Sequence, residues 1–575
     1  MNSLIASMKQ KGLLSEAVAE QVEALLAEGQ SLEEAVLAAD GVSEEALLRF
    51  LAENFDLPYI DAEKLERQPP PRELLAQFPA RLLLGHRVLP LEQRDDVTVV
   101  ATSRISNTTA LDELRLACGK DVALALAPSS EIDRCLKQML GVGADTLQSM
   151  AADELQVIDT HDDEDLDLTN AALDASIIRF VNQILTEAIE SRATDVHIEP
   201  FEDQLRIRYR IDGVLQQSNV PASVRRFHAA IVSRIKILSH LDIAEKRLPQ
   251  DGRIKLKISG REIDVRVSII PMIHGEAVVL RILDRGDALL GTEHLGMAQR
   301  DREHFDAILE MPHGIVLVTG PTGSGKTTTL YAALSKINDV ERKIITVEDP
   351  VEYQLKGVNQ IQVSTKTGLT FAAGLRAILR HDPDVVLVGE IRDLETAEIA
   401  VQASLTGHLV FSTLHTNDAP GAATRLVDMG LEPYLVASSL EVVVAQRLVR
   451  VICKACKQPL PAAEVLRLRE QFGDWVPEVL YHGTGCRQCQ NTGYRGRQGV
   501  FEVMVISDDI RTLILRNAPS HELRKVATRE GMRSLREDGW RVVCEGRTTI
   551  DEVIRNTKDE AAGAAMAAVG AGGPR

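Results

Sequence analysis

The glycine-rich segment at residues 314–330 carries the clearest chemical signature of the chain. Residues 315–319 are β-branched and apolar, which predicts a buried parallel strand. Residues 320–327 match the pattern G-x-x-x-x-G-K-[ST], in which glycines let backbone N–H groups turn toward phosphate oxygens. We expect Lys326 to reach the β- and γ-phosphates of a nucleoside triphosphate and Thr327 to ligate Mg²⁺. A chance match would require the strand before the loop and the helical composition after it to be accidental too. The candidate nucleotide-binding residues are Gly320, Pro321, Thr322, Gly323, Ser324, Gly325, Lys326, Thr327 and Thr328.

Two acidic segments follow apolar runs farther along the chain. Residues 344–347 lead into residues 348–352 (Glu-Asp-Pro-Val-Glu), and residues 385–388 lead into Gly-Glu at Glu390. Carboxylates at the ends of parallel strands lie beside the ligand crevice of such a sheet. We therefore expect one carboxylate of the first segment to orient the attacking water. Glu390 would bind Mg²⁺ through water in a Walker-B-like arrangement, with Gly-Glu in place of the commoner Asp-Glu. The alternative is an ordinary acidic loop.

Two histidines, His408 and His415, stand at opposite ends of a further predicted strand. A histidine in such a place is often structural. The other interpretation is a sensor of the γ-phosphate, or a relay between the sheet and an interface. The residues alone leave both open.

Four of the seven cysteines form two C-x-x-C pairs, Cys453 with Cys456 and Cys486 with Cys489. Twenty-nine residues separate the pairs. Four thiolates at this spacing suit tetrahedral Zn²⁺ in a closed structural site. Free thiols or redox pairs are the alternative. No open ligand position is implied, so we predict a role for zinc in folding and none in catalysis.

The elements that position these residues read as alternating strands and helices. Strands are expected at residues 315–319, 343–347, 385–388 and 409–412, with helical segments between them. This order predicts a parallel sheet with helices on both faces, within a nucleotide domain at residues 291–450.

The remaining sequence divides into further segments. Residues 171–290 read as a second α/β unit, whose basic strands include Arg266 and Arg281 and could supply positive charge to a bound phosphate. The other predicted segments are a helical repeat at 1–60, a small α/β domain at 61–142, an acidic flexible linker at 143–170, a zinc module at 451–500, a helical domain at 501–558 and a disordered tail at 559–575.

Size and charge narrow the functional classes. The chain has 575 residues, 45% of them hydrophobic, and a net charge of −19, which argues against nucleic acid as the main partner. We find no apolar run long enough to span a membrane and no signal region at the start. We therefore expect a soluble intracellular protein that reaches any membrane through partners.

The motifs together resemble those of the GspE/PilB-type secretion ATPases, which power type II secretion and type IV pilus assembly. The resemblance covers about residues 80–555. It rests on the P-loop, the tetracysteine module and five segments, at 345–352 (an Asp box), 388–393 (a Walker B motif), 407–416 (a His box), 193–200 and 247–253. It implies an α/β fold in which a RecA-like P-loop motor domain follows a PAS-like α/β middle domain.

The resemblance also implies roles for single residues. Glu352 would be the general base, and Glu390 would coordinate Mg²⁺. Arg266 and Arg281 would act as arginine fingers from the middle domain. Arg376 and Arg380 would support the same site. His408 and His415 would link the phosphate state to subunit geometry.

The resemblance further implies ATP, Mg²⁺ and Zn²⁺ as ligands of a homo-hexameric ring. That ring would dock on the cytoplasmic face of an inner-membrane platform protein, with a cytoplasmic docking protein and no direct nucleic acid. His381 stands where the family usually has glutamine, and the N-terminal repeat lacks the Arg-Leu-Gly residues of relatives that bind cyclic di-GMP, so we do not predict that ligand. The zinc module and long N-terminal region favour an assembly motor. A DNA translocase or conjugation-type ATPase, and a non-hydrolysing nucleotide-sensing scaffold, are the alternatives.

Overall fold

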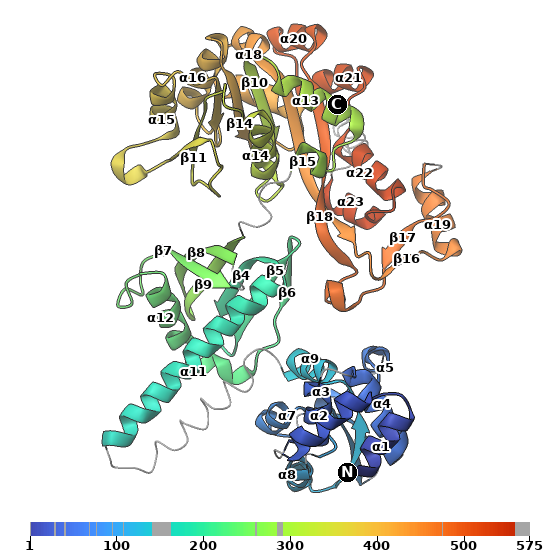
Figure 1. Ribbon diagram of the computed structural model, residues 1–575. Helices are drawn as coiled ribbons and strands as arrows, with labels where there is room; N and C mark the ends of the chain where they lie inside the picture. The colour runs from blue at the N-terminus through green and yellow to red at the C-terminus, as the bar shows by residue number, and fades with distance from the viewer. Residues whose placement is uncertain are drawn as a thin grey trace, which may run out of the picture. The chain divides into compact units, whose positions relative to one another are not determined.

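The computed structural model describes residues 2–27, 30–39, 42–67, 69–75, 77–94, 96–106, 108–140, 163–258, 261–284, 291–473 and 475–557. Figure 1 traces the chain from its N-terminus in blue to its C-terminal part in red. By its internal contacts the chain divides into two compact units. The first comprises Met1–Ile258 with Asp264–Ile282, and the second comprises Ser259–Ile263 with Leu283–Arg575.

The first unit begins with short amphipathic helices that pack on one another. These are α1 Asn2–Gln10, α2 Glu16–Ala27, α3 Leu32–Ala38 and α4 Glu44–Phe55. Within the predicted helical repeat, Ser15 and Ser43 each stand at a helix start: the Val18 N–H donates to Ser15 Oγ (3.4 Å) and the Ala46 N–H donates to Ser43 Oγ (3.3 Å). A serine hydroxyl at this position accepts a hydrogen bond from a backbone N–H of the first turn, which has no partner within the helix. The repeat therefore marks two helix starts.

A small α/β sheet follows, with strand order β1-β2-β3 and a parallel β2–β3 pair. Its elements are α5 Ala62–Arg67, α6 Arg72–Leu75, α7 Ala80–His86, β1 Val88–Arg94, β2 Val97–Thr102, α8 Thr108–Cys118, β3 Asp121–Leu126 and α9 Ser129–Leu140.

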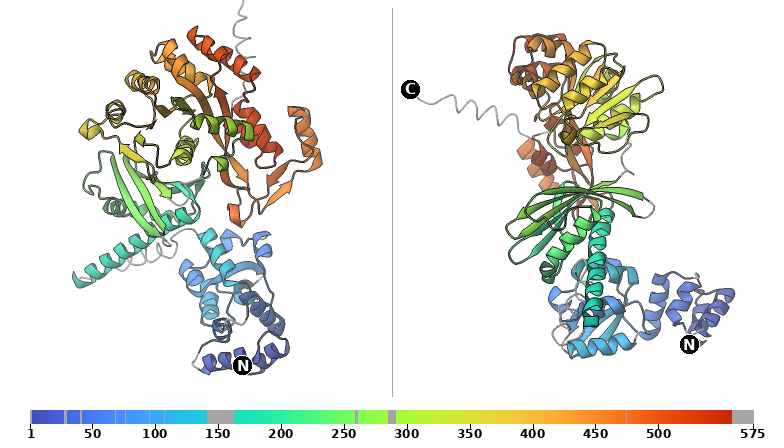
Figure 2. Two further views of the ribbon diagram at one scale, coloured as in Figure 1. Left: turned by 45° about the horizontal axis from the view of Figure 1, so that its top comes forward. Right: turned by 90° about the vertical axis from the view of Figure 1, so that its left-hand side faces the viewer.

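The middle part of the first unit is a six-stranded sheet of order β6-β5-β4-β9-β8-β7, with α11 and α12 on one face (Figure 2). Its elements are α11 Asp163–Glu190, β4 Ala193–Pro200, β5 Leu205–Ile211, β6 Val214–Gln217, α12 His228–Leu238, β7 Gln250–Ile258, β8 Arg261–Met272 and β9 Gly275–Asp284. Along β5, Ile207 and Tyr209 are buried, while Arg206, Arg208 and Arg210 are half-buried. Alternation in a strand thus sets the arginines on the face opposite the core.

The second unit is built on a seven-stranded sheet of order β12-β11-β13-β14-β10-β15-β18. Its strands are β10 Gly314–Thr319, β11 Ile344–Glu348, β12 Asn359–Gln362, β13 Val385–Val388, β14 Leu409–Leu414, β15 Leu440–Ile452 and β18 Tyr494–Val505. Each neighbouring pair is parallel except β15 with β18. The predicted α/β class is confirmed.

Helices cover both faces of this sheet, as the alternating order predicts. Ile315 and Leu317 of β10 belong to the core on one face, and Val316 and Val318 belong to the core on the other. A strand buried on both faces needs apolar residues at every position, which explains the continuous run. Full burial of one such side chain stabilises the fold by about 1.5–3 kcal/mol. The helices are α13 Gln299–Leu309 and α14 Lys326–Ile337 on the Val316 side, and α15 Phe371–Ile378, α16 Leu394–Leu405, α17 Pro420–Asp428 and α18 Pro433–Ser439 on the other.

The cysteine module is an insertion within the sheet, which differs from the expected sequence of separate domains. Strand β15 continues to Ile452, and β18 begins at Tyr494 on the far side of the module and pairs back with β15. The expected boundary at 500–501 therefore falls inside β18, because its apolar residues complete the motor core. The remaining elements are β16 Lys457–Pro459, α19 Ala462–Phe472, β17 Tyr481–Gly483, α20 Asp508–Leu515, α21 Ser520–Arg529, α22 Leu535–Cys544 and α23 Ile550–Asn556.

Two predicted segments lie mostly outside the described residues. Of the acidic linker, residues 143–162 are outside, and residues 163–170 form the first turns of α11 instead of a tether. Extending an existing helix costs little once its packed half, at Ile177 to Ala188, has formed. The tail at 559–575 also lies outside. Among the described helices, none has the length and apolar content that crossing a membrane requires.

Candidate functional site

The P-loop joins the end of β10 to the start of α14, as predicted. Its glycines take backbone conformations that side chains rarely adopt, with φ of +148° at Gly320, +79° at Gly323 and +90° at Gly325. A Cβ at Gly320 would lie 2.6 Å from the backbone oxygen of Gln446. Glycine is therefore required there both for conformation and for the close approach of β15.

The Lys326 side chain folds over the loop that precedes it. Its Nζ donates to the backbone oxygens of Gly320 (2.8 Å) and Pro321 (3.0 Å). Burial lowers the Lys326 pKa, while the nearby Glu390 carboxylate acts in the opposite direction. Within the described part of the chain, the buried Ser324 Oγ has no hydrogen-bond partner. A loop with an ammonium group, an unpaired hydroxyl and a helix N-terminus fits a phosphate group.

The two glutamates of the Asp box occupy different environments. Glu348, at the end of β11, is only 4% exposed and accepts hydrogen bonds from the Tyr331 hydroxyl and from Thr346 Oγ1 (2.6 Å). Its oxygens are thus engaged within the protein. Glu352 lies in the loop that follows β11 and is half-buried. Of the two, Glu352 is the better placed to meet a ligand, so its predicted role as general base remains open to test.

Glu390 follows β13 at the same edge of the sheet as the P-loop. Its carboxylate lies 2.5 Å from Arg392 Nη2 and 3.0 Å from His415 Nε2. Burial favours the protonated acid, but hydrogen bonds from Arg392 and His415 outweigh it and lower the Glu390 pKa. The structure therefore brings Lys326, Glu390 and His415 together, with the carboxylate held ionised.

The two histidines of the His box are separated by strand β14. Gly314 pairs with Leu409 at the start of the parallel β10–β14 ladder, and Thr319 pairs with Leu414 at its end. His415 is therefore at the phosphate edge. His408 is at the opposite edge, where its Nδ1 lies 2.8 Å from the Ala403 oxygen. Of its two predicted roles, a relay fits this position, and direct contact with a phosphate of the same chain does not.

The predicted arginines lie on other elements. Arg376 on α15 pairs with Glu395 (2.6 Å) and is half-exposed, and Arg380 Nη1 donates to the Arg376 oxygen (2.9 Å). Arg266 and Arg281 lie on β8 and β9 of the first unit. There Arg281 Nε lies 3.0 Å from Asp195 Oδ1. The arginine-finger roles stay predictions.

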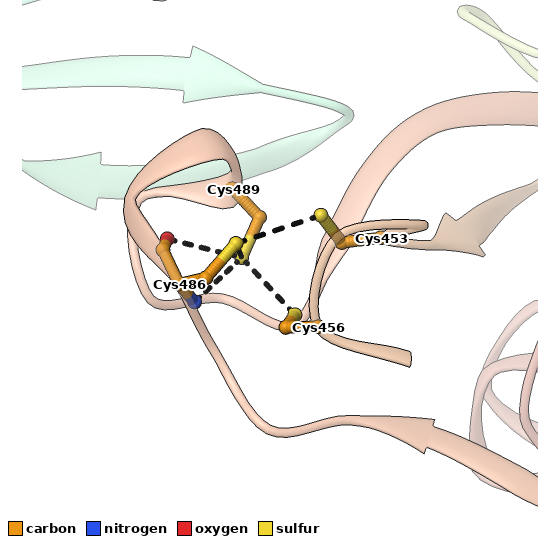
Figure 3. A group of neighbouring side chains, drawn as sticks. All are labelled: Cys453, Cys456, Cys486 and Cys489. Carbon is orange, nitrogen blue, oxygen red and sulfur yellow. Dashed lines mark hydrogen bonds between the residues drawn. The ribbon is translucent and has the colours of Figure 1, made fainter. Parts of the chain in front are cut away.

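The four cysteines converge in the inserted module, where their sulfurs point toward one another (Figure 3). The Sγ atoms of Cys453 and Cys486 are 3.8 Å apart, as are those of Cys456 and Cys489. A tetrahedral ion with Zn–S bonds of about 2.3 Å sets its sulfurs about 3.8 Å apart, so these side chains fit zinc.

The backbone around the cysteines supports thiolate ligands. Burial opposes ionisation of the Cys489 thiol, yet the N–H groups of Cys486 (3.2 Å) and Gly493 (3.3 Å) donate to its sulfur. These bonds, together with the neighbouring thiols of Cys486 and Cys456, bring the Cys489 pKa down to about 7. Such N–H···S contacts orient metal-binding sulfurs and stabilise their charge.

Sequence reasoning missed several residues that shape this site. Thr319 and Thr416 join the ends of β10 and β14, with Oγ1 atoms 2.6 Å apart. Gln446 of β15 accepts from Thr329 Oγ1 (2.8 Å), and Arg447 donates to the Asn417 oxygen (3.0 Å). The Gln-Arg pair interrupts an otherwise apolar run at residues 442–449, and that interruption could have indicated them.

Comparisons with known proteins agree with these motifs. The model of the family "Type II/IV secretion system protein" matches residues 170–555, and that of the MshEN domain matches residues 55–145. Type II secretion system protein E of Pseudomonas aeruginosa is 53% identical over 76% of this chain and 85% of its own length. The type IV pilus assembly ATPase PilB of Myxococcus xanthus is 41% identical over 92% of this chain and 94% of its own length. Among solved structures, the pilus retraction motor PilT with bound ADP is 26% identical, covers 66% of this chain and 97% of that one, and has a TM-score of 0.45. The chain therefore belongs to the Type II/IV secretion system protein family, the secretion and pilus assembly ATPases that its motifs indicate.

Proposed function

We propose that this chain hydrolyses ATP to drive type II protein secretion or type IV pilus assembly. The observation that carries the proposal is the meeting of Lys326 with the Glu390–His415 pair at the edge of the sheet where the P-loop lies. An ammonium, an ionised carboxylate and a helix N-terminus at one place suit a triphosphate with its metal ion.

In the proposed reaction, Glu352 accepts a proton from a water molecule whose oxygen attacks the γ-phosphorus. The bond from the γ-phosphorus to the bridging oxygen breaks, and ADP and phosphate leave. Lys326 and the loop N–H groups hold the phosphates and stabilise the charge that spreads over their oxygens. Mg²⁺, held by Thr327 and through water by Glu390, would neutralise charge on the β- and γ-phosphates. Arg266, Arg281, Arg376 and Arg380 are proposed to add positive charge to the site.

The wider assembly is part of the same proposal. We infer a homo-hexamer at the cytoplasmic face of the inner membrane, bound to a platform protein and a docking protein. The relatives are named for secretion and pilus machines, and that supports this inference. The cysteine module is proposed to hold a structural zinc ion, because all four positions of the tetrahedron come from the protein.

The test measures phosphate release by the full-length protein. Lys326→Ala and Glu352→Gln should each lower turnover by at least about 100-fold. Lys336→Ala is the matched control on the same helix, because Lys336 forms a surface pair with Asp306 (2.7 Å) away from the P-loop. Such pairs contribute little to stability. Unchanged turnover in Lys326→Ala would refute the assignment.

A further inference from the structure

Gln360 on the edge strand β12 joins both flanks of the segment that carries Glu352. Its Oε1 accepts from the Leu355 N–H (2.8 Å). Its Nε2 is within hydrogen-bonding distance of the Tyr353 backbone oxygen (3.1 Å) and of Glu348 Oε1 (3.1 Å). If the segment is taken as residues 349–352, the Gln360 carboxamide contacts Glu348 before it and both Tyr353 and Leu355 after it.

The other side of this cluster is the helix that begins at the P-loop. The hydroxyl of Tyr331 on α14 donates to Glu348, and Gln360 Nε2 lies 3.3 Å from the same Tyr331 hydroxyl. The rings of Tyr331 and Tyr353 meet edge to face, with centroids 4.8 Å apart. Burial raises the Tyr353 pKa, and the side chain of Thr328, next to the predicted Mg²⁺ ligand, acts in the opposite direction. The Glu352 segment is therefore fixed to the helix whose N-terminus meets the phosphates.

A glutamine suits this place for a specific reason. The carboxamide offers one acceptor to Leu355 and two N–H donors to the oxygens around it. A glutamate would offer no donor and would set a second carboxylate beside Glu348. A leucine of similar size would leave a backbone N–H and a buried carboxylate oxygen without this partner, which is costly.

We propose that Gln360 is a positioning residue for hydrolysis, which holds the Glu352 carboxylate at a fixed distance from the nucleotide phosphates. This inference rests on the proposed role of Glu352 as general base. Gln360 itself touches neither nucleotide nor water in the proposal. It acts on turnover because displacement of a catalytic group by about 1 Å can slow a reaction about 100-fold.

The test uses the full-length protein with Gln360→Leu, and Gln362→Leu as the matched control. Gln362 lies on the same strand and is exposed. We expect Gln360→Leu to lower kcat by about 10- to 100-fold, while the Kd of a fluorescent ATP analogue stays within about twofold. The control should change neither quantity. Loss of ATP affinity in parallel with kcat would show a merely structural role and overturn the proposal.

A double variant asks whether Gln360 acts through Glu352. If it does, Glu352→Gln with Gln360→Leu should be no slower than Glu352→Gln alone, because the positioned group is already absent. A further, additive loss would overturn the proposal. Wild-type turnover in Glu352→Gln would refute the assigned general base. Full kcat in Gln360→Leu, with a slow Glu352→Gln, would refute only the positioning role.

Discussion

His415 Nε2 lies 3.0 Å from Glu390 Oε2, although the two residues follow different strands of the sheet. Arg392 contacts the other oxygen of the same carboxylate. Since β13 and β14 are parallel neighbours, their ends meet at one edge, and the pair closes that edge beside the P-loop.

This pair predicts how acid affects stability. The Glu390 pKa lies below its ordinary value of 4.5 because hydrogen bonds from Arg392 and His415 outweigh burial. The stability gained from its ionised form is therefore fully present above pH 4.5 and is lost as pH falls through the lower folded value. Glu390→Gln should cost about 1 kcal/mol at pH 7 and less at pH 3.

The measurement follows tryptophan fluorescence during urea unfolding. Both tryptophans of the chain, Trp475 and Trp540, stack on each other in the second unit, so their emission reports that unit. An equal difference between Glu390→Gln and wild type at pH 7 and pH 3 would contradict the prediction.

The P-loop glycines should differ in tolerance to alanine. A Cβ at Gly320 would lie 2.6 Å from the Gln446 oxygen and 2.7 Å from Ser324 Oγ, whereas a Cβ at Gly323 meets nothing within 4 Å in the described structure. Both positions have positive φ, which alone costs roughly 1 kcal/mol. Gly320→Ala should therefore weaken ATP binding by more than about 10-fold, and Gly323→Ala by clearly less. Calorimetric titration with ATP measures both, and equal losses would be inconsistent with the geometry.

The cysteine cluster predicts zinc-dependent folding of the inserted module. Cys486→Ser should abolish bound zinc and shift the tryptophan emission to the red, because Trp475 packs in the core that the module shares with helices α22 and α23. Cys544→Ser is the control, since Cys544 is exposed and outside the cluster. Metal analysis by mass spectrometry gives the zinc content. Zinc retained in Cys486→Ser, or lost in Cys544→Ser, would count against the assigned ligands.

Local patterns in the sequence predicted the parts of the site that depend on local chemistry. The P-loop, the acidic strand ends and the C-x-x-C pairs are each short and self-contained, so their residue types indicate their position. The fold class followed from the alternation of strands and helices for the same reason.

Long-range pairing could not be predicted in this way. Nothing local distinguishes Glu348, held by Tyr331, from Glu352 four positions later. His408 and His415 lie in one motif, yet the strand between them sets them at opposite edges of the sheet. Strand β18 returns to the sheet only after the cysteine module, because its partner β15 lies before it.

A buried ion pair between the sheet and the C-terminal helices gives the last prediction. Glu502 of β18 is 0% exposed, accepts from the Ala419 N–H (2.7 Å) and pairs with Arg524 of α21 (3.0 Å). Arg524 also contacts Asp418, just after the His box (3.0 Å). Burial raises the Glu502 pKa to about 6 against the opposing effect of Arg524.

A raised pKa means that folding favours the protonated acid. The stability this gives is fully present below the ordinary value of 4.5 and is lost as pH rises through about 6. Glu502→Gln keeps the shape without the titration, so its stability relative to wild type should rise by about 2 kcal/mol between pH 4.5 and 7.5. The stability of Arg524→Met relative to wild type should instead fall between pH 4.5 and 7.5, because this variant leaves the buried carboxylate without its main opposing charge. The cost at pH 7.5 should be about 3–5 kcal/mol. Urea unfolding at both pH values measures these differences, in which titrations common to all variants cancel. If the free energy of unfolding changed with pH in the same way for wild type and both variants, the prediction that Glu502 titrates with a raised pKa would be wrong.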